Sequence, residues 1–212
     1  EGFGTFSTGQ GSHSEGFFTI ASSDFSHAEG EFTEAYGTAA HAEGSQTVSD
    51  AFSSHAEGVL TNAGNTGAHA EGLTTNAAGV ASHAEGRNTI ASGNYSHAAG
   101  LNTIAIETAS HSEGINTTAI GIASHAEGVE SGATGYASHA EGIHTAAGAS
   151  GSHSEGINTT ASGIGSHAEG KGTIASGDYS HAEGDPTTAS GYAAHAEGYN
   201  TLSGATGSHS EG

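Results

Sequence analysis

The stretch SHAEGRNTIASGNY, residues 82–95, is one turn of a repeat that runs through the whole chain. Its histidine, His83, belongs to a series in which a histidine occupies every fourteenth position from His13 to His209. Fifteen of the 16 histidines keep this register, and only His144 lies outside it. A period this strict, without one inserted residue, predicts a solenoid in which each coil stacks directly on the next.

The 14-residue unit consists of two similar halves. Thr89-Ile90-Ala91-Ser92-Gly93 matches Ser82-His83-Ala84-Glu85-Gly86, so each half has small residues at alternate positions. Alternation of this kind is typical of a β-strand with one tightly packed face. We therefore expect an all-β, parallel β-roll of about 15 coils, each with two short strands and two turns. The small residues, threonine included, are predicted to point inward.

A heptad helix is the alternative to be weighed, because the period is twice that of a heptad. The repeat places two near-regular glycines in every unit, and each would cost about 1 kcal/mol in a helix. There is also no apolar seam at the first and fourth heptad positions. The pattern therefore favours strands.

The composition restricts both the interior and the partners. With 36 glycines, few large apolar residues and no Cys, Met or Trp, the interior must be very narrow. The absence of cysteine excludes disulfides and thiolate metal sites. A formal net charge of −21, with Arg87 and Lys171 as the only basic residues, excludes nucleic acid and anionic membranes as expected partners. No apolar run reaches the roughly 18 residues of a membrane-spanning segment.

We expect a single repeat domain over residues 1–212, made of 15 coils that each consist of one 14-residue unit. The sequence starts with Glu1-Gly2 and ends with Glu211-Gly212, at the same phase of the repeat. This predicts a fragment of a longer fibre.

The outward positions of the half that begins with serine carry His and Glu in nearly every coil. We call these residues the His–Glu ladder; Ala99 stands at the one position where the glutamate is missing. The ladder consists of His13, Glu15, His27, Glu29, His41, Glu43, His55, Glu57, His69, Glu71, His83, Glu85, His97, His111, Glu113, His125, Glu127, His139, Glu141, His153, Glu155, His167, Glu169, His181, Glu183, His195, Glu197, His209 and Glu211.

The residue after the glycine continues the same face and is often apolar. We call this second series the apolar row: Val59, Leu73, Leu101, Ile115, Val129, Ile143 and Ile157. Near-constant polar residues beside an apolar row predict an interface between copies of the chain, closed by rotational symmetry. With three-fold closure, every layer would hold three histidines and three glutamates. We expect structural His–Glu rings, in which the carboxylate accepts the imidazole N–H and raises the imidazole pKa.

The same residues are of types that occur in catalytic and metal sites. Ser and His are adjacent on a strand and point to opposite faces, so the hydroxyl cannot reach the imidazole, and we predict no enzyme. His and Glu two residues apart on a strand are separated by about 7 Å, which predicts that they cannot chelate one ion within a chain. Rings of three histidines across chains could bind a divalent metal, so the histidines of the ladder are the only candidate metal site. No cofactor is expected.

The T-x-A-x-G and S-x-A-x-G units, two to each 14-residue coil, resemble the head repeats of YadA-like trimeric autotransporter adhesins, and the similar repeats of phage tail-fibre and neck-appendage proteins. The resemblance covers the whole chain. It implies a left-handed parallel β-roll and three chains side by side in a surface-exposed head or stalk. The chain differs from those adhesins at the two outward positions of the interface strand, where it has His and Glu instead of apolar residues.

These expectations combine into a homotrimeric, extracellular fibre segment on a cell surface or virion. It projects an appendage and supports attachment to a host or surface, with two further copies of itself as partners and a cell-surface glycan or matrix receptor as a candidate ligand. The alternative is a monomeric solenoid whose exposed His–Glu ladder binds a periodic ligand, such as ice or a mineral, or metal ions. A buried ladder face would favour the fibre, and an exposed one the monomer.

Overall fold

The computed structural model describes residues 2–212, so the predicted domain boundary at Glu1 lies outside the described residues. The chain divides into two compact units, Glu1–Ile106 and Glu107–Gly212. The described residues of both units form a parallel β-solenoid, with about 15 turns in total. The expectation of one continuous domain stays a prediction. Residues 2–212 contain no helix, and hence none of the length and apolarity needed to cross a membrane.

Each coil of the first unit has a long strand that begins at the repeat histidine and a short strand in the other half. The long strands are β3 (His13–Phe17), β5 (His27–Glu31), β7 (His41–Ser45), β9 (His55–Val59), β11 (His69–Leu73), β13 (His83–Arg87) and β15 (His97–Leu101). β1 (Gly2–Phe3) is the end of a long strand and pairs with β3. The short strands are β2 (Phe6–Ser7), β4 (Ile20–Ala21), β6 (Glu34–Ala35), β8 (Val48–Ser49), β10 (Asn62–Ala63), β12 (Asn76–Ala77), β14 (Ile90–Ala91) and β16 (Ile104–Ala105).

The second unit repeats this coil. Its long strands are β17 (His111–Ile115), β19 (His125–Val129), β21 (His139–Ile143), β23 (His153–Ile157), β25 (His167–Lys171) and β29 (His209–Glu211). Its short strands are β18 (Thr118–Ala119), β20 (Gly132–Ala133), β22 (Ala146–Ala147), β24 (Thr160–Ala161) and β26 (Ile174–Ala175). In two coils the long and short strands join into the continuous strands β27 (His181–Ala189) and β28 (His195–Ser203).

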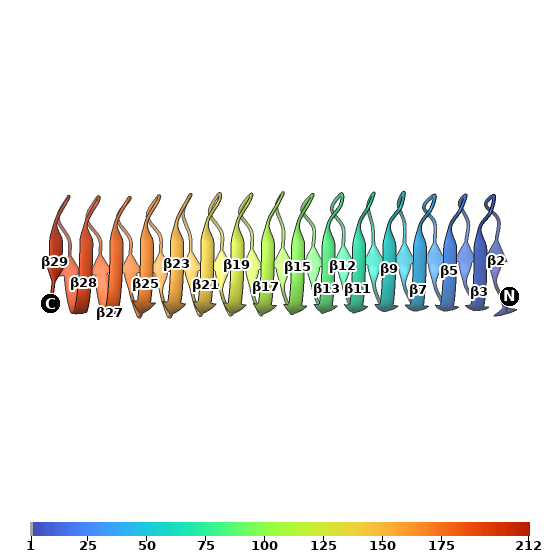
Figure 1. Ribbon diagram of the computed structural model, residues 1–212, viewed down its shortest axis with the longest axis horizontal. Coiled ribbons are helices and arrows are strands. Elements are labelled where there is room, and N and C mark those ends of the chain that lie inside the picture. The colour runs from blue at the N-terminus through green and yellow to red at the C-terminus, as the bar shows by residue number, and fades with distance from the viewer. Residues whose placement is uncertain (1) are drawn as a thin grey trace. The chain divides into compact units, whose positions relative to one another are not determined.

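Within each unit, equivalent strands of successive coils pair in parallel and in a register of one whole repeat (Figure 1). In the first unit, β11 pairs with β9 and β13, so that His69 lies opposite both His55 and His83. The backbone N–H of His83 donates to the carbonyl oxygen of Ser96 in the next coil, at 2.9 Å. Parallel stacking by whole repeats, predicted from the period, is confirmed in both units.

The interior is as narrow as the composition predicts. The buried residues are Ala, Ser, Thr and Gly, and the largest side chains that are fully buried are all threonines. Where a serine precedes the ladder histidine, its buried hydroxyl closes the adjacent turn. For example, Ser82 Oγ donates to the carbonyl oxygen of Gly79 at 2.8 Å. The core is therefore made of methyl groups and short hydroxyls, with no room for larger residues.

The turn that follows each long strand does not begin at the repeat glycine. The glycine after the ladder glutamate and the residue after that glycine belong to the long strand, and the chain turns only at the following residue. Five asparagines occupy this position with φ of 55–56°, the left-handed region that asparagine tolerates better than most residues: Asn88, Asn102, Asn116, Asn158 and, within the continuous strand β28, Asn200. The two halves of a coil are therefore unequal in strand length.

Candidate functional site

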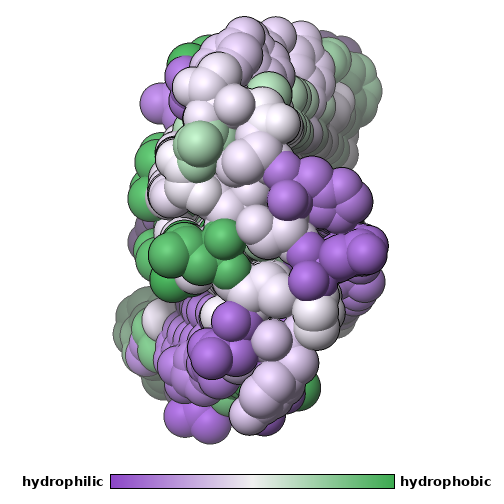
Figure 2. All heavy atoms as spheres, turned by 90° about the vertical axis from the view of Figure 1, so that its left-hand side faces the viewer, coloured by the Kyte–Doolittle hydropathy of each residue, from purple (hydrophilic) through white to green (hydrophobic). Residues whose placement is uncertain are grey.

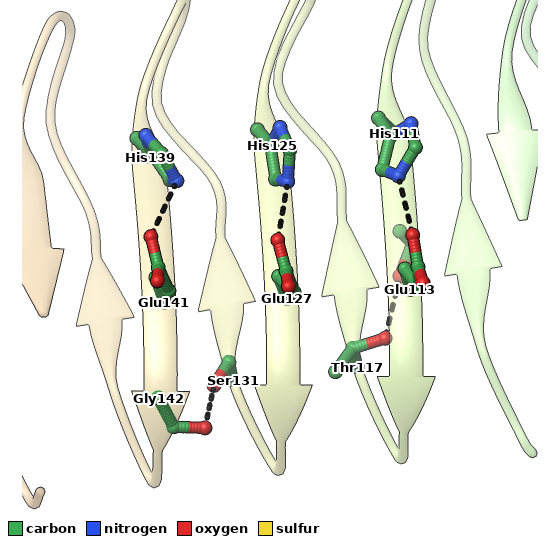
Figure 3. A network of polar contacts seen from close by, with 10 residues as sticks. His111, Glu113, Thr117, His125, Glu127, Ser131, His139, Glu141 and Gly142 are labelled. Atoms are coloured by element: carbon green, nitrogen blue, oxygen red, sulfur yellow. Dashed lines mark hydrogen bonds and ion pairs between the residues drawn. The ribbon is translucent and has the colours of Figure 1, made fainter. Parts of the chain in front are cut away.

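The His–Glu ladder lies on the outward face of the long strands, as predicted. Each imidazole stacks on the equivalent imidazole of the neighbouring coil within its unit. His153 and His167, for example, have ring centroids 4.6 Å apart and planes inclined by 3°. Figure 3 shows His111, His125 and His139 side by side on β17, β19 and β21, each with its ring directed toward the glutamate of the same strand. Strand register alone thus produces a column of imidazoles beside a column of carboxylates.

The imidazole and carboxylate ends approach each other within one chain. The Nε2–Oε2 distance is 3.4 Å for His153 and Glu155, the same for His41 and Glu43, and 4.0 Å for His83 and Glu85. The expectation that about 7 Å separates the two groups was wrong, because it applies to the backbone positions and both side chains lean along the strand. In the coil with Ala99, His97 instead approaches Glu85 of the preceding coil, at 3.8 Å.

The ladder is half-buried in the single chain. The side chains of His153 and Glu155 are 35% and 42% exposed, whereas the His153 Nε2 atom itself is inaccessible to solvent and has no hydrogen-bond partner. Hydrogen-bond geometry between imidazole and carboxylate is met for His111 with Glu113, at 3.4 Å, but not for most of the column. The ladder therefore has close His–Glu contacts with few aligned hydrogen bonds.

The electrostatics of the column differ from the prediction. Burial lowers the pKa of His41, and the imidazoles of His55 and His27 on either side lower it further. The nearby carboxylates act in the opposite direction but do not prevail. The expected rise of the imidazole pKa is therefore wrong for His41, because burial and, after it, the stacked imidazoles disfavour a positive charge on the ring. The pKa of His69 and His139 is lowered for the same reasons.

One glutamate of the ladder has a perturbed pKa as well. The pKa of Glu71 is raised by burial first, then by a hydrogen bond with Glu85 and by repulsion from Glu57 and Glu85. Like charges about one coil apart disfavour each other's ionised form. The carboxylate column therefore concentrates negative charge along one line of the surface.

The apolar row is exposed beside the ladder. The side chains of Ile115, Ile143 and Ile157 are 42–43% exposed. In the second unit, Ile115, Val129, Ile143 and Ile157 lie in direct register on β17, β19, β21 and β23. Figure 2 shows that hydrophilic and hydrophobic side chains form separate patches around the coil at the C-terminal end. The row and the ladder thus share one strand face, as the alternation predicts.

Ser and His do point to opposite sides of the strand. Ser82 is 1% exposed and faces the interior, while His83 lies on the outer face. The Ser82 hydroxyl is engaged with a turn carbonyl, so it is not presented to an imidazole. A nucleophilic Ser–His pair is therefore not formed at this position.

A His–Glu pair off the ladder was missed. His144 Nδ1 lies 2.9 Å from Oε2 of Glu130, and both side chains are half exposed. The two residues occupy the same turn position of successive coils, one whole repeat apart. The spacing of one whole repeat between Glu130 and His144 is the signal in the sequence that predicts this pair.

Comparison with protein families gives a match for part of the chain. A model that describes the YadA head domain repeat matches residues 84–106, 112–138, 154–180 and 182–202. Comparison with curated proteins gives no match. The matched segments comprise both the ladder strands and the short strands of their coils.

Proposed function

We propose that the chain, in which four segments between residues 84 and 202 match the YadA head domain repeat, is an adhesin-like structural repeat protein and works as a trimeric, surface-exposed fibre segment. Three copies lie side by side with their ladder faces toward a common axis. The segment projects an appendage from a cell surface or virion, as an adhesin head or stalk or a tail fibre does, and supports attachment to a host or surface.

The observation that carries this proposal is the exposed apolar row beside the half-buried ladder. Ile115, Val129, Ile143 and Ile157 form a continuous apolar strip in one unit, and such strips on soluble proteins mark surfaces that bind another protein. In a closed assembly with rotational symmetry, the same strip on every copy packs against the strips of the other copies. The surface that stays outward is the face of the short strands, which varies from coil to coil and is the part available to a glycan or matrix receptor.

The absolute mass of the chain in solution tests the proposal. Light scattering at neutral pH is expected to give three times the chain mass of 20.6 kDa. A mass of one chain at micromolar concentration would reject the trimer and would favour the monomeric solenoid with an exposed ladder. Repeating the measurement with a chelator and at low pH separates assembly that depends on metal or protons from assembly by the apolar row alone.

A further inference from the structure

We propose that the His–Glu ladder of a single chain binds divalent transition-metal ions of the zinc type, each held by two stacked histidines and the carboxylate between them. The inference concerns ligands within one chain and does not depend on the trimer. In the second unit, His153, Glu155 and His167 each offer one ligand atom, and these atoms lie within 4.8 Å of one another. His167, Glu169 and His181 form the same group one coil further.

The donor set suits such an ion. Zinc is commonly bound by imidazole nitrogen and carboxylate oxygen, and a site with three protein ligands leaves a fourth position for water. The zinc–nitrogen distance is about 2.0–2.1 Å, so ligand atoms on one ion lie roughly 3.3 Å apart. His153 Nε2 and Glu155 Oε2 are already 3.4 Å apart.

To bind one ion, the two histidine rings need only tilt toward each other, and tilted rings already occur in the ladder. The rings of His153 and His167 are nearly parallel, with centroids 4.6 Å apart, and must tilt to bring their Nε2 atoms together. The rings of His125 and His139, in the same unit, are inclined by 31° at a centroid distance of 4.7 Å. The ladder backbone therefore accommodates tilted imidazoles.

The unpartnered nitrogen atoms supply an independent observation. The Nε2 atoms of His153, His167 and His181 are inaccessible to solvent and have no hydrogen-bond partner, although carboxylates lie close by. Buried polar nitrogens are normally satisfied, so a column of such atoms beside carboxylates is an arrangement that a cation would complete. The formal net charge of −21 favours cation uptake as well.

The geometry also limits the number of ions. A neutral imidazole has one acceptor nitrogen, so His167 cannot serve both of its groups at once. Two ions in successive coils would also repel each other at the coil spacing. We therefore expect adjacent groups to be filled alternately, at about one ion for every two ladder histidines.

Equilibrium dialysis of the full chain against zinc chloride, followed by elemental analysis, measures this number directly. The parent chain is expected to bind about one zinc per two ladder histidines. The double variant Glu155→Gln/Glu169→Gln removes the carboxylate from both groups that contain His167, and is expected to bind one ion fewer. His144→Gln is the matched control, because it removes a histidine that lies off the ladder, and its count is expected to equal that of the parent.

Two outcomes would overturn the proposal. One is the absence of zinc binding by the parent chain at micromolar zinc. The other is displacement of the zinc by excess calcium, which prefers oxygen ligands and would indicate binding to carboxylates alone. If the double variant does not give the circular dichroism of a β-fold, His167→Gln replaces it and is likewise expected to lose one ion; an unchanged count in a folded variant would also reject the assignment.

Discussion

The hydroxyl groups of Ser112 and Thr117 meet inside the second unit, with 2.9 Å between Oγ and Oγ1. In most other coils an alanine replaces the serine, and the buried threonine hydroxyl has no hydrogen-bond partner. Thr173, in a coil with Ala168, is one example. The same fold therefore contains coils in which the inner hydroxyl is satisfied and coils in which it is not.

This difference predicts that Ala168→Ser stabilises the chain. The new hydroxyl would reach Thr173 as Ser112 reaches Thr117, and a buried hydrogen bond contributes about 1 kcal/mol to the free energy of unfolding. Urea denaturation, followed by circular dichroism, measures the change. Ser112→Ala is the reverse experiment and is expected to lower the free energy of unfolding by about 1–3 kcal/mol, because it leaves the Thr117 hydroxyl unsatisfied. A loss of stability in Ala168→Ser would mean that the interior has no space for the extra oxygen.

The glycine column after the ladder glutamates predicts a large effect from a single methyl group. Gly72 has φ of +112°, and a Cβ at this position would overlap the carbonyl oxygen of Gly86 in the next coil. Backbone strain and overpacking together lead us to expect that Gly72→Ala lowers the free energy of unfolding by at least about 3 kcal/mol. Gly132 has open space around its Cβ position, so Gly132→Ala is the control and is expected to be neutral or stabilising by about 0.4–1 kcal/mol. Comparable losses in the two variants would contradict this account of the column.

The period and the small-residue alternation were sufficient to predict the fold. The strict spacing around His83 predicted whole-repeat stacking, and the alternation around Ala91 predicted which residues face inward. The asparagine turns were predictable because few other residues tolerate a left-handed backbone. The unequal strand lengths were not, since small residues alternate in the same way in both halves of the coil.

The candidate site was predicted in position but not in its electrostatics. Sequence spacing gives backbone separations, whereas the 3.4 Å contact between His153 and Glu155 depends on side-chain rotamers. The direction of the pKa shift of His41 depends on burial and on two stacked neighbours, which a sequence shows only after the coil register is known in space. Reasoning from one coil therefore overestimated the effect of the carboxylate and omitted that of the adjacent imidazoles.

The lowered pKa of His41 predicts a stability that falls on mild acidification. The pKa of an unfolded histidine is about 6.5, so below this value the unfolded chain binds more protons than the folded one. The contribution of His41 is thus fully present above pH ~6.5 and is lost as the pH falls toward its folded pKa. Thermal unfolding measured with a chelator between about pH 7.5 and 5.5 should show a falling midpoint. His41→Gln should weaken this dependence. A midpoint that rises on acidification would show that attraction between the imidazoles and carboxylates outweighs burial and imidazole stacking.

The proposed subunit interface predicts that two similar isoleucines respond differently to the same substitution. Ile143, in the apolar row, and Ile174, on a short strand, are each 42% exposed in the single chain. Ile143→Asp would place a carboxylate against its own symmetry copies, where charge burial and like-charge repulsion oppose assembly, so dissociation of the trimer at micromolar concentration is expected. Ile174→Asp places the same charge on the face that stays in water and should leave the mass unchanged. Light scattering distinguishes the two variants, and circular dichroism confirms that each is folded. If only Ile174→Asp dissociates the trimer, the interface lies on the short strands. If neither variant changes the mass, the apolar row is not part of the interface.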